Sequence, residues 1–456
     1  MSGKKSLDDR QLESPVVMVR PPFARGNIIA LVLLISNFCS LYGVIGVVAH
    51  IPSLLLVSVG FGLVSSIYIL INMRVVLLIL SKTPVWMTIF VGYILPIFHI
   101  IVLYLCELIP FGRVFYWAAL NSSLAAIFVA AVVYGISSDK IKISKFFYLS
   151  LVIISVEFLS NSVDYSFTQK VLFYSSSVVG KSLSLSRFMG FFGIPNMAAF
   201  SILLGVFAVS VSVSSISLRY VLFCVISAVL IVLTESRTSM MLLAFVLVGV
   251  GGVKIARRPG NLLAVILVAP VVLGGGLAAL MATSFFGGGG GGAYVDRMTS
   301  MFATLFADGG QGDVSTQLRI KAVSQFLHLI SERPLTGYGP DAIVDMVGSG
   351  ELVAVSQNSW LEWAVEYGIL YPFFVSILFF VIYLSELRKS KLSVNGDFYP
   401  FGVRMILCVI IVSSFSIMDF FNIRSFVVVF GLVIGSFLRM VSINSDIRKN
   451  RGMPVG

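Results

Sequence analysis

The chain carries very little charge for its length. Only 12% of its 456 residues are Asp, Glu, Lys or Arg, whereas 58% are hydrophobic. Soluble globular domains contain roughly 25% charged residues, so this composition excludes an ordinary soluble domain. The charges that are present are unbalanced, with a net charge of +11 at pH 7, so their positions along the chain become informative.

Cysteine, histidine and the common cofactor motifs are equally scarce. The cysteines are Cys39, Cys106, Cys224 and Cys408, and the histidines are His50, His99 and His328. No CxxC spacing occurs, so we expect small buried hydrophobic cysteines rather than disulfides or a zinc site. The chain also lacks a Walker-type glycine loop and an HExxH pair, which removes the usual support for ATP-driven transport and metalloprotease chemistry. We expect no metal and no other cofactor.

Long apolar runs make up most of the chain. A run of about 18 or more apolar residues is typical of a transmembrane helix. We predict such helices at 27–48, 52–72, 84–106, 114–136, 145–162, 190–214, 218–234, 238–255, 262–283, 359–385, 400–418 and 424–440. The charged segment "NMRVVLLILSKTP" is not counted as a further span. The predicted fold class is an all-α polytopic membrane protein of about 12 transmembrane helices.

Lysine and arginine positions predict the orientation of these helices. Positive charge collects in cytoplasmic loops. With a cytoplasmic N-terminus, the inner connections include the basic segments 140–145 and 254–258, whereas outer connections mix cations with acids, as in Glu107 and Arg113. Both termini are then cytoplasmic. The net positive charge follows from this topology and from contact with anionic lipid, and we expect no nucleic-acid partner.

The prediction divides the chain into five segments. They are a flexible cytoplasmic tail at 1–26, transmembrane helices one to nine at 27–283, an extracytoplasmic loop at 284–358, transmembrane helices ten to twelve at 359–440, and a cytoplasmic tail at 441–456. The polar N-terminal tail does not have the pattern of a cleavable signal peptide.

The extracytoplasmic loop contains a predicted helix. After six consecutive glycines, the stretch "DVSTQLRIKAVSQFLHLISERP" has helical periodicity, and Pro334 and Gly337 end it. Its apolar residues are Ile320, Val323, Leu327 and Ile330. This stripe predicts a helix lying across the membrane domain or its interface. Aromatic residues then follow at Trp360, Trp363 and Tyr367, which suit a membrane–water interface.

Three arginines, Arg187, Arg237 and Arg319, fall in or around the predicted outer face. A guanidinium is always charged and matches phosphate oxygens with a planar fork of donors. Each arginine also has a simpler interpretation: Arg187 as an interfacial anchor, Arg237 as a cap paired with Glu235, and Arg319 as a solvated helix residue. Their coincidence on one face favours a site for an anionic lipid head group.

Four motifs carry a resemblance to a known family. They are "RFMGFFGIPNMAAF", "ESRTSMMLLAF", "LRIKAVSQFLHLISERPLTGYGPD" and "SQNSWLEWAVEYGIL". In this order, and with one large outer loop, they resemble the O-antigen ligase and polymerase superfamily of bacterial polysaccharide assembly, over about 185–380. The resemblance implies a GT-C-like fold and a location in the bacterial inner membrane.

The resemblance also implies an activity and a set of site residues. It implies a metal-independent glycosyltransferase that takes a glycan from undecaprenyl pyrophosphate on the outer face of the membrane. Arg187, Arg237 and Arg319 would grip the pyrophosphate, with Glu235 as a further catalytic candidate. The implied substrate-binding residues are Asn196, Tyr338, Gln357 and Asn358. The implied partners are the lipid-linked donor, a glycan or lipid acceptor, membrane lipids and assembly proteins such as a chain-length regulator.

The clearest departure from the family pattern is Gln357. Ligases of this superfamily usually have a histidine immediately before the asparagine, and glutamine cannot accept a proton as a general base does. His328 lies nine residues from Arg319, on the opposite face of the predicted helix, and His99 is expected to be a hydrogen-bonded packing residue in mid-membrane. The remaining base candidates are Glu235, Glu362, Glu366, Asp313 and Asp341.

The missing histidine favours a repeat-unit polymerase over a ligase, although both use the same donor chemistry. A polysaccharide flippase or secondary transporter is a rival of another class, and a structural assembly subunit is a further alternative. Transporters tend to place polar or broken segments at mid-membrane in paired halves. No such half-repeat occurs here, and the polar groups concentrate outside the apolar runs.

Overall fold

The structure, a computed structural model, describes residues 23–37, 54–138, 140–163, 195–212, 217–234, 236–257, 314–353, 356, 358–390, 407–412, 414, 426–436 and 438. Its helices are α1 (Phe23–Ser36), α3 (Leu54–Ile71), α4 (Met73–Lys82), α5 (Val85–Ile89), η2 (Phe90–Ile94), α6 (Leu95–Leu105), α7 (Phe111–Ser137), α8 (Lys140–Val163), α10 (Pro195–Ser212), α11 (Leu218–Leu233), α12 (Arg237–Arg257), α15 (Val314–Glu332), α16 (Ala342–Ser349), α17 (Ser359–Tyr367) and α18 (Leu370–Ser390). Residues 407–412 and 426–436 are also helical. Within these ranges there is no strand, which confirms the all-α prediction.

Two of the described helices are long and apolar enough to cross a membrane. They are Val85–Leu105, which joins α5, η2 and α6, and Phe111–Ser137, which is α7. A third candidate is the pair Leu55–Ile71 and Met73–Ser81, bent by 87°. In the other helices, the apolar stretch with described side chains is shorter, at 10–17 residues. The chain is therefore a membrane protein by these features, while the count of twelve spans stays a prediction.

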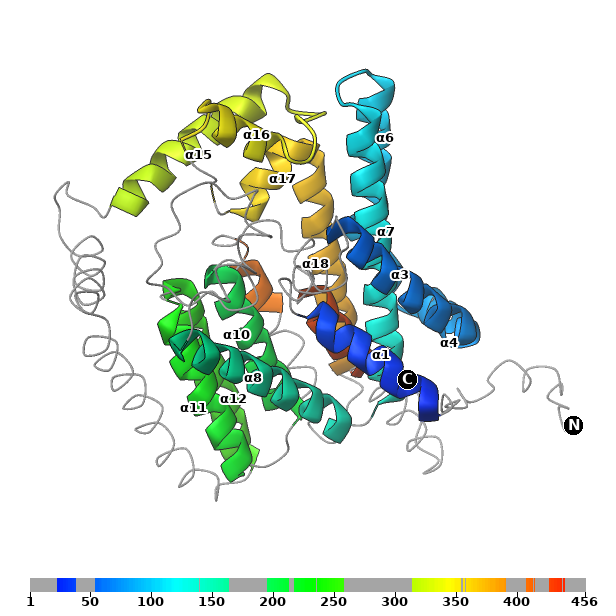
Figure 1. Cartoon of the computed structure of the whole chain (residues 1–456), viewed down its shortest axis with the longest axis vertical. Helices are drawn as coiled ribbons and strands as arrows, with labels where there is room; N and C mark the ends of the chain where they lie inside the picture. Colours follow the sequence, from blue (N-terminus) through cyan, green and yellow to red (C-terminus); the bar gives the residue numbers. More distant parts are fainter. Residues whose placement is uncertain are drawn as a thin grey trace, which may run out of the picture.

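The predicted span 84–106 contains a π-helical turn, η2, just before Pro96. Proline has no N–H and cannot donate to the carbonyl four residues earlier. A π turn changes the hydrogen-bond register locally and is a common way for a helix to absorb such a break. The helix thus continues to Leu105, turns through residues 106–110, and returns as α7. In Figure 1, α6 and α7 run side by side.

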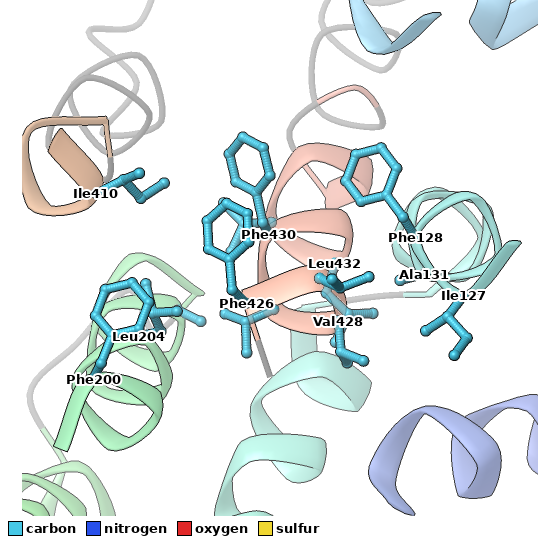
Figure 2. Close-up of a cluster of buried hydrophobic side chains, with 14 of the residues drawn as sticks. Ile127, Phe128, Ala131, Phe200, Leu204, Ile410, Phe426, Val428, Phe430 and Leu432 are labelled. Atoms are coloured by element: carbon cyan, nitrogen blue, oxygen red, sulfur yellow. The ribbon is translucent and has the colours of Figure 1, made fainter. Parts of the chain in front are cut away.

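The centre of the bundle is the helix at 426–436, which packs between α7 and α10. Figure 2 shows Phe430 and Phe426 of this helix between Phe128 of α7 and Phe200 of α10. The ring centroids of Phe426 and Phe430 are 4.9 Å apart, and those of Phe128 and Phe430 are 6.1 Å apart. These rings form part of the apolar core that joins α7, the 426–436 helix and α10.

Glycine allows the 426–436 helix to approach α7 closely. A Cβ added at Gly435 would lie 2.2 Å from the carbonyl oxygen of Val132, and one added at Gly431 would lie 2.7 Å from the Cβ of Ala131. The Gly431-x-x-x-Gly435 spacing puts both glycines on one face of the helix. This is the small-residue packing that brings helix backbones together in membranes.

The predicted tenth helix, 359–385, is wrong as a single element. It is interrupted at Gly368, whose φ of +80° ends α17 before α18 begins. The aromatic residues of α17 were also misplaced. Trp363 and Tyr367 are only 0% and 4% exposed, so they pack in the core instead of anchoring the helix at an interface.

Helices α15, α16 and α17, with the connecting turn 333–341, form a layer at one end of the α6–α7 hairpin (Figure 1). We call this the α15–α17 layer. It has its own small apolar core around Phe326, Ile343, Leu352 and Val365. The predicted stripe on α15 is partly wrong, because Leu327 is 55% exposed and Phe326 is buried in its place.

Candidate functional site

The eight predicted site residues are described to different extents in the structure. Arg187, Glu235 and Gln357 lie outside the described residues. Asn196, Arg237 and Arg319 lie on α10, α12 and α15 with only their backbone described. Tyr338 and Asn358 are described with their side chains. Whether the three arginines converge thus stays a prediction.

The turn before α12 fixes the position of Arg237 along the chain. The Thr234 hydroxyl donates to the Ile231 carbonyl (2.7 Å) and accepts from the Ser236 N–H (3.2 Å). Arg237 is the first residue of α12. The first N–H groups of a helix have no partner within the helix, and its N-terminus carries a partial positive charge. A cation at this position is unfavourable by itself and becomes favourable when an anion is bound there.

Asn358 is the N-cap of α17. Its Oδ1 accepts hydrogen bonds from the N–H groups of Trp360 (3.0 Å) and Leu361 (3.4 Å). This is the usual asparagine cap, which satisfies N–H groups that the helix leaves open. The capping oxygen thereby gives Asn358 a structural function, and its predicted role in substrate binding stays a prediction.

A buried carboxylate organises the residues on either side of position 357. Glu362 is 4% exposed, in the first turn of α17, and accepts a hydrogen bond from the Ser356 hydroxyl (3.2 Å). The Ser356 oxygen in turn accepts from the Asn358 N–H (3.0 Å). The two neighbours of Gln357 are therefore tied to α17 by side-chain hydrogen bonds, which sequence reasoning did not anticipate.

Tyr338 is the other described site residue. Its hydroxyl donates to the Glu332 carboxylate, and the Arg333 guanidinium lies 4.5 Å from its ring centroid. Desolvation, together with the neighbouring Glu332 carboxylate, raises the pKa of Tyr338 to about 12. The phenol is thus a neutral donor at physiological pH. Arg333 was quoted in a motif but not singled out, and only the fold shows that it stacks on Tyr338.

Two of the motifs that carry the resemblance are joined by backbone hydrogen bonds. The N–H groups of Tyr338 and Gly339 donate to the carbonyls of Val365 (2.8 Å) and Glu366 (2.9 Å). The Ile369 N–H donates to the Pro334 carbonyl (2.8 Å). The turn "RPLTGYGPD" and the end of α17 therefore form one unit, although nearly thirty residues separate them in the sequence.

Glycine is required on both sides of this junction. Gly337 and Gly368 have φ values of +61° and +80°. A Cβ on Gly337 would lie 2.5 Å from the Glu366 carbonyl oxygen, and one on Gly368 would lie 2.2 Å from that of Leu335. Other residues rarely adopt this left-handed conformation, so both the conformation and the space restrict these positions to glycine.

Polar contacts attach the α15–α17 layer to the α6–α7 hairpin. Arg113 Nη2 lies 2.7 Å from Asp345 Oδ2, and Trp117 Nε1–H donates to Asp341 Oδ2 (2.8 Å). His99 Nε2 lies 2.7 Å from the Thr336 carbonyl oxygen. His99 is thus hydrogen-bonded, as expected, but to the layer. These partners are more than 200 residues apart, and no local sequence pattern indicates such a pairing.

The carboxyl group of Asp341 sits in an unusual setting. Asp341 has a positive φ of +66° and is half-buried. Burial raises the pKa of this carboxyl, while the Trp117 hydrogen bond and the Arg113 charge oppose the shift. Of the other base candidates, Glu362 is buried and accepts a hydrogen bond from Ser356, and the backbone carbonyl of Glu366 is part of the junction. His328 is exposed and pairs with Glu332 (3.3 Å).

A sequence comparison relates part of this chain to a known family. Residues 222–371 match a sequence model of the family described as O-Antigen ligase. The matched range begins in α11, ends in α18, and contains six of the eight predicted site residues, the exceptions being Arg187 and Asn196. Over this range the match supports the resemblance of the chain to the O-antigen ligase and polymerase superfamily, and members of the matched family are glycosyltransferase-like enzymes. No curated protein matches the chain.

Proposed function

We propose that this protein is a polysaccharide repeat-unit polymerase. It transfers a growing glycan from undecaprenyl pyrophosphate to the next lipid-linked repeat unit on the outer face of the bacterial inner membrane. The observation that carries the proposal is the family match over 222–371, which spans the α11–α12 turn, the α15–α17 layer and the start of α18.

The proposed reaction exchanges one bond at the anomeric carbon of the sugar. A hydroxyl oxygen of the acceptor forms a bond to this carbon, and the bond from the carbon to the pyrophosphate oxygen breaks. Undecaprenyl pyrophosphate leaves, and the hydroxyl proton passes to a carboxylate or to water. Negative charge grows on the leaving group, and guanidinium groups held in place beforehand stabilise it without a metal ion.

The position of Arg237 supports this role. As the first residue of α12 it stands where the helix end itself favours an anion. A pyrophosphate at this point would interact with the guanidinium and with the open N–H groups of the helix. Arg319 on α15 and Arg187 would add further cations on the same predicted face.

The α15–α17 layer supports a site for a sugar acceptor. Its junction of backbone hydrogen bonds holds the Tyr338 turn against the end of α17, while Ser356 and Glu362 brace the start of α17 next to Gln357. A rigid support of this kind suits hydrogen-bonding side chains that must be aligned with a substrate hydroxyl.

The presence of glutamine at position 357 favours a polymerase over a ligase. Ligases of the superfamily usually have histidine there. The ligase alternative would transfer finished polymer to lipid A core or another acceptor with the same donor chemistry. The two functions therefore differ in acceptor, which a glycan analysis can distinguish.

Deleting the gene and sizing the lipid-linked and surface glycans tests the proposal. Single repeat units without long chains would support a polymerase. Long polymer stranded on the lipid carrier would identify a ligase instead. An unchanged glycan profile would contradict both activities and would favour the transporter or the structural assembly subunit instead.

Arg237→Ala tests the site itself. We expect this variant to insert and express normally but to restore no long polymer in the deletion strain. Lys321→Ala, which removes an exposed cation of α15, is the matched control and should restore polymer. Normal polymer from Arg237→Ala would remove the main support for the site. Gln357→Ala should be milder, with shortened rather than absent chains.

A further inference from the structure

Helix α4 is too short to cross a membrane and takes no part in the proposed site. Its ten residues extend about 15 Å, half of the roughly 30 Å hydrocarbon thickness. The preceding helix α3 has 18 residues and extends about 27 Å, so α3 alone nearly spans the hydrocarbon. The chain then bends by 87° between these two helices. By these lengths, α4 begins where α3 reaches one edge of the hydrocarbon region.

The bend is stabilised by specific hydrogen bonds. Asn72 Nδ2 donates to the Tyr68 carbonyl (2.8 Å), and the Asn72 carbonyl accepts from the Val76 N–H (3.1 Å). At the other end of α4, the Thr83 hydroxyl donates to the Ile79 carbonyl (2.6 Å). Backbone groups left open near lipid are costly. The break therefore has hydrogen-bonded backbone groups on both sides, because the Asn72 side chain satisfies a carbonyl near the end of α3 and the Thr83 side chain satisfies a carbonyl at the end of α4.

The residues of α4 divide its surface into three sides. Val76 and Ile79 are buried against the protein, at 4% and 7% exposure. At about 100° per residue, Met73 and Leu77 lie next to each other on an adjoining side, and both are exposed. Beyond them lie the exposed residues Arg74 and Ser81. One side thus faces protein, one is apolar and uncovered, and one is polar.

The uncovered apolar side of α4 is accompanied by exposed apolar residues on the helices before and after it in the chain. Leu63, Ile67 and Leu70 of α3 are exposed apolar residues that lead towards the bend. In the next helix along the chain, α5, Trp86 is 52% exposed. Tryptophan is enriched where a membrane meets water, so the apolar belt of α3, the side of α4 and Trp86 fit a single membrane boundary.

We propose that α4 lies in the plane of the membrane surface and binds anionic phospholipid there. Met73 and Leu77 enter the acyl-chain boundary, and Arg74 contacts the head-group phosphates. Lys82, the last residue of α4, adds a second cation to the same short helix. The predicted topology assigns this surface to the cytoplasmic leaflet, whose anionic lipids attract basic residues close to the membrane. This inference depends on membrane insertion alone and stands apart from the proposed enzymatic activity.

Spin labels on α4 test its placement. In the full-length chain with its four cysteines changed to serine, a nitroxide is attached at Leu77→Cys or, as the matched control, at Ser81→Cys, and each protein is placed in lipid nanodiscs. We expect the ratio of accessibility to oxygen over a water-soluble nickel complex to be several-fold higher at position 77 than at 81. Equal, high nickel accessibility at both positions would place α4 in water. Low nickel accessibility at both would make it a re-entrant segment. Either result overturns the proposal.

The lipid charge is tested separately. Phosphatidylglycerol added to the detergent-solubilised chain should raise its melting temperature more than phosphatidylcholine does. We expect the double variant Arg74→Gln/Lys82→Gln to lose most of that difference, and the control Lys321→Gln on α15 to keep it. An unchanged difference in the double variant would overturn the assignment of these cations to anionic lipid. Because the measurement uses stability alone, it is independent of glycan transfer.

Discussion

The two ends of α7 are held in contrasting ways. Towards its C-terminal half, α7 meets the 426–436 helix through glycines and phenylalanines, with backbones nearly in contact at Gly435 and Val132. Near its N-terminus, α7 meets the α15–α17 layer through the side chains of Arg113 and Trp117. One contact is apolar and close-packed, whereas the other consists of a few polar bonds.

This difference separates what holds the bundle together from what positions the layer. Close packing is intolerant of added volume, so the bundle contact acts as a fixed part of the fold. Single polar contacts each contribute little net stability, so the layer depends on several of them, on its own internal junction, and on Trp363 and Tyr367 of α17, which pack in the main core. Substitutions in the bundle should therefore affect folding. Substitutions in the layer should affect its docking and, through it, the proposed transfer of glycan.

Gly368→Ala should give the largest effect. The substitution combines a backbone conformation of φ +80° and ψ 164°, which is essentially restricted to glycine and costs another residue about 1–3 kcal/mol, with a Cβ 2.2 Å from the Leu335 carbonyl oxygen. Overpacking adds about 1–3 kcal/mol. We expect the α17 junction to open, glycan transfer to be lost, and proteolysis of the 314–353 region to accelerate.

Gly350→Ala is the matched control for this change. Gly350 also has a positive φ, of +83°, in the left-handed α region, and nothing lies within 4 Å of an added Cβ. It should show only the backbone strain, about 1–2 kcal/mol, and retain activity. If both variants behave alike, contact with Leu335 does not account for the glycine at 368.

Gly435→Ala should destabilise the bundle itself. The added methyl group would clash with the Val132 backbone, and we expect a loss of about 1–3 kcal/mol in reversible unfolding in mixed micelles. Gly60→Ala on α3 has open space around it and should gain up to about 1 kcal/mol from helix propensity. Opposite signs in the two variants would confirm that backbone approach explains the glycine; a shared gain would contradict it.

The sequence predicts the apolar helices well because hydrophobic length is a direct constraint of the bilayer. The spans 84–106 and 114–136 correspond to Val85–Leu105 and Phe111–Ser137. The prediction of helices from apolar runs fails where a single residue interrupts such a run. Gly368 splits the predicted tenth helix, because the chain turns there to meet Pro334, and hydropathy does not register a positive φ.

The site is predicted only in outline, and the reason lies in long-range pairing. The motifs around Tyr338 and Glu366 were both recognised, but their mutual hydrogen bonds depend on the fold. The docking of Asp341 on Trp117 crosses more than 200 residues and gives no periodic signal. Charge identity pointed to Arg237 and Arg319, while their mutual geometry is not determined by sequence pattern.

Trp117→Phe probes the polar docking of the layer. Removing the indole N–H leaves the partly buried Asp341 carboxyl without this donor, at a cost of about 1–3 kcal/mol. Hydrogen exchange in α16 should increase, while exchange in the 426–436 helix stays unchanged. Equal changes in both places would mean that the layer and the bundle unfold together, which would remove the contrast between them.

The same contact should depend on pH. Because burial raises the folded-state pKa of Asp341, protonation of this carboxyl favours the docked state. The stabilisation of the docked layer by this protonation is complete below the ordinary carboxyl pKa. It is lost as the pH rises through the raised pKa of Asp341. Asp341→Asn, which tolerates a positive φ, should remove that pH dependence of exchange in α16. An unaltered pH profile would show that another group titrates.

The Arg113–Asp345 pair should give the smallest effect. Its side chains are 28% and 59% exposed, so solvent screens the attraction and the pair contributes about 0.2–1 kcal/mol. A double-mutant cycle with Arg113→Gln and Asp345→Asn should yield a coupling energy in that range, which falls further at high salt. A coupling well above it would show that this ion pair, rather than the Trp117 contact and the glycine junction, is the main attachment of the layer. The contrast at α7 between a close-packed apolar contact and a few weak polar bonds would then have to be replaced by one dominant electrostatic contact.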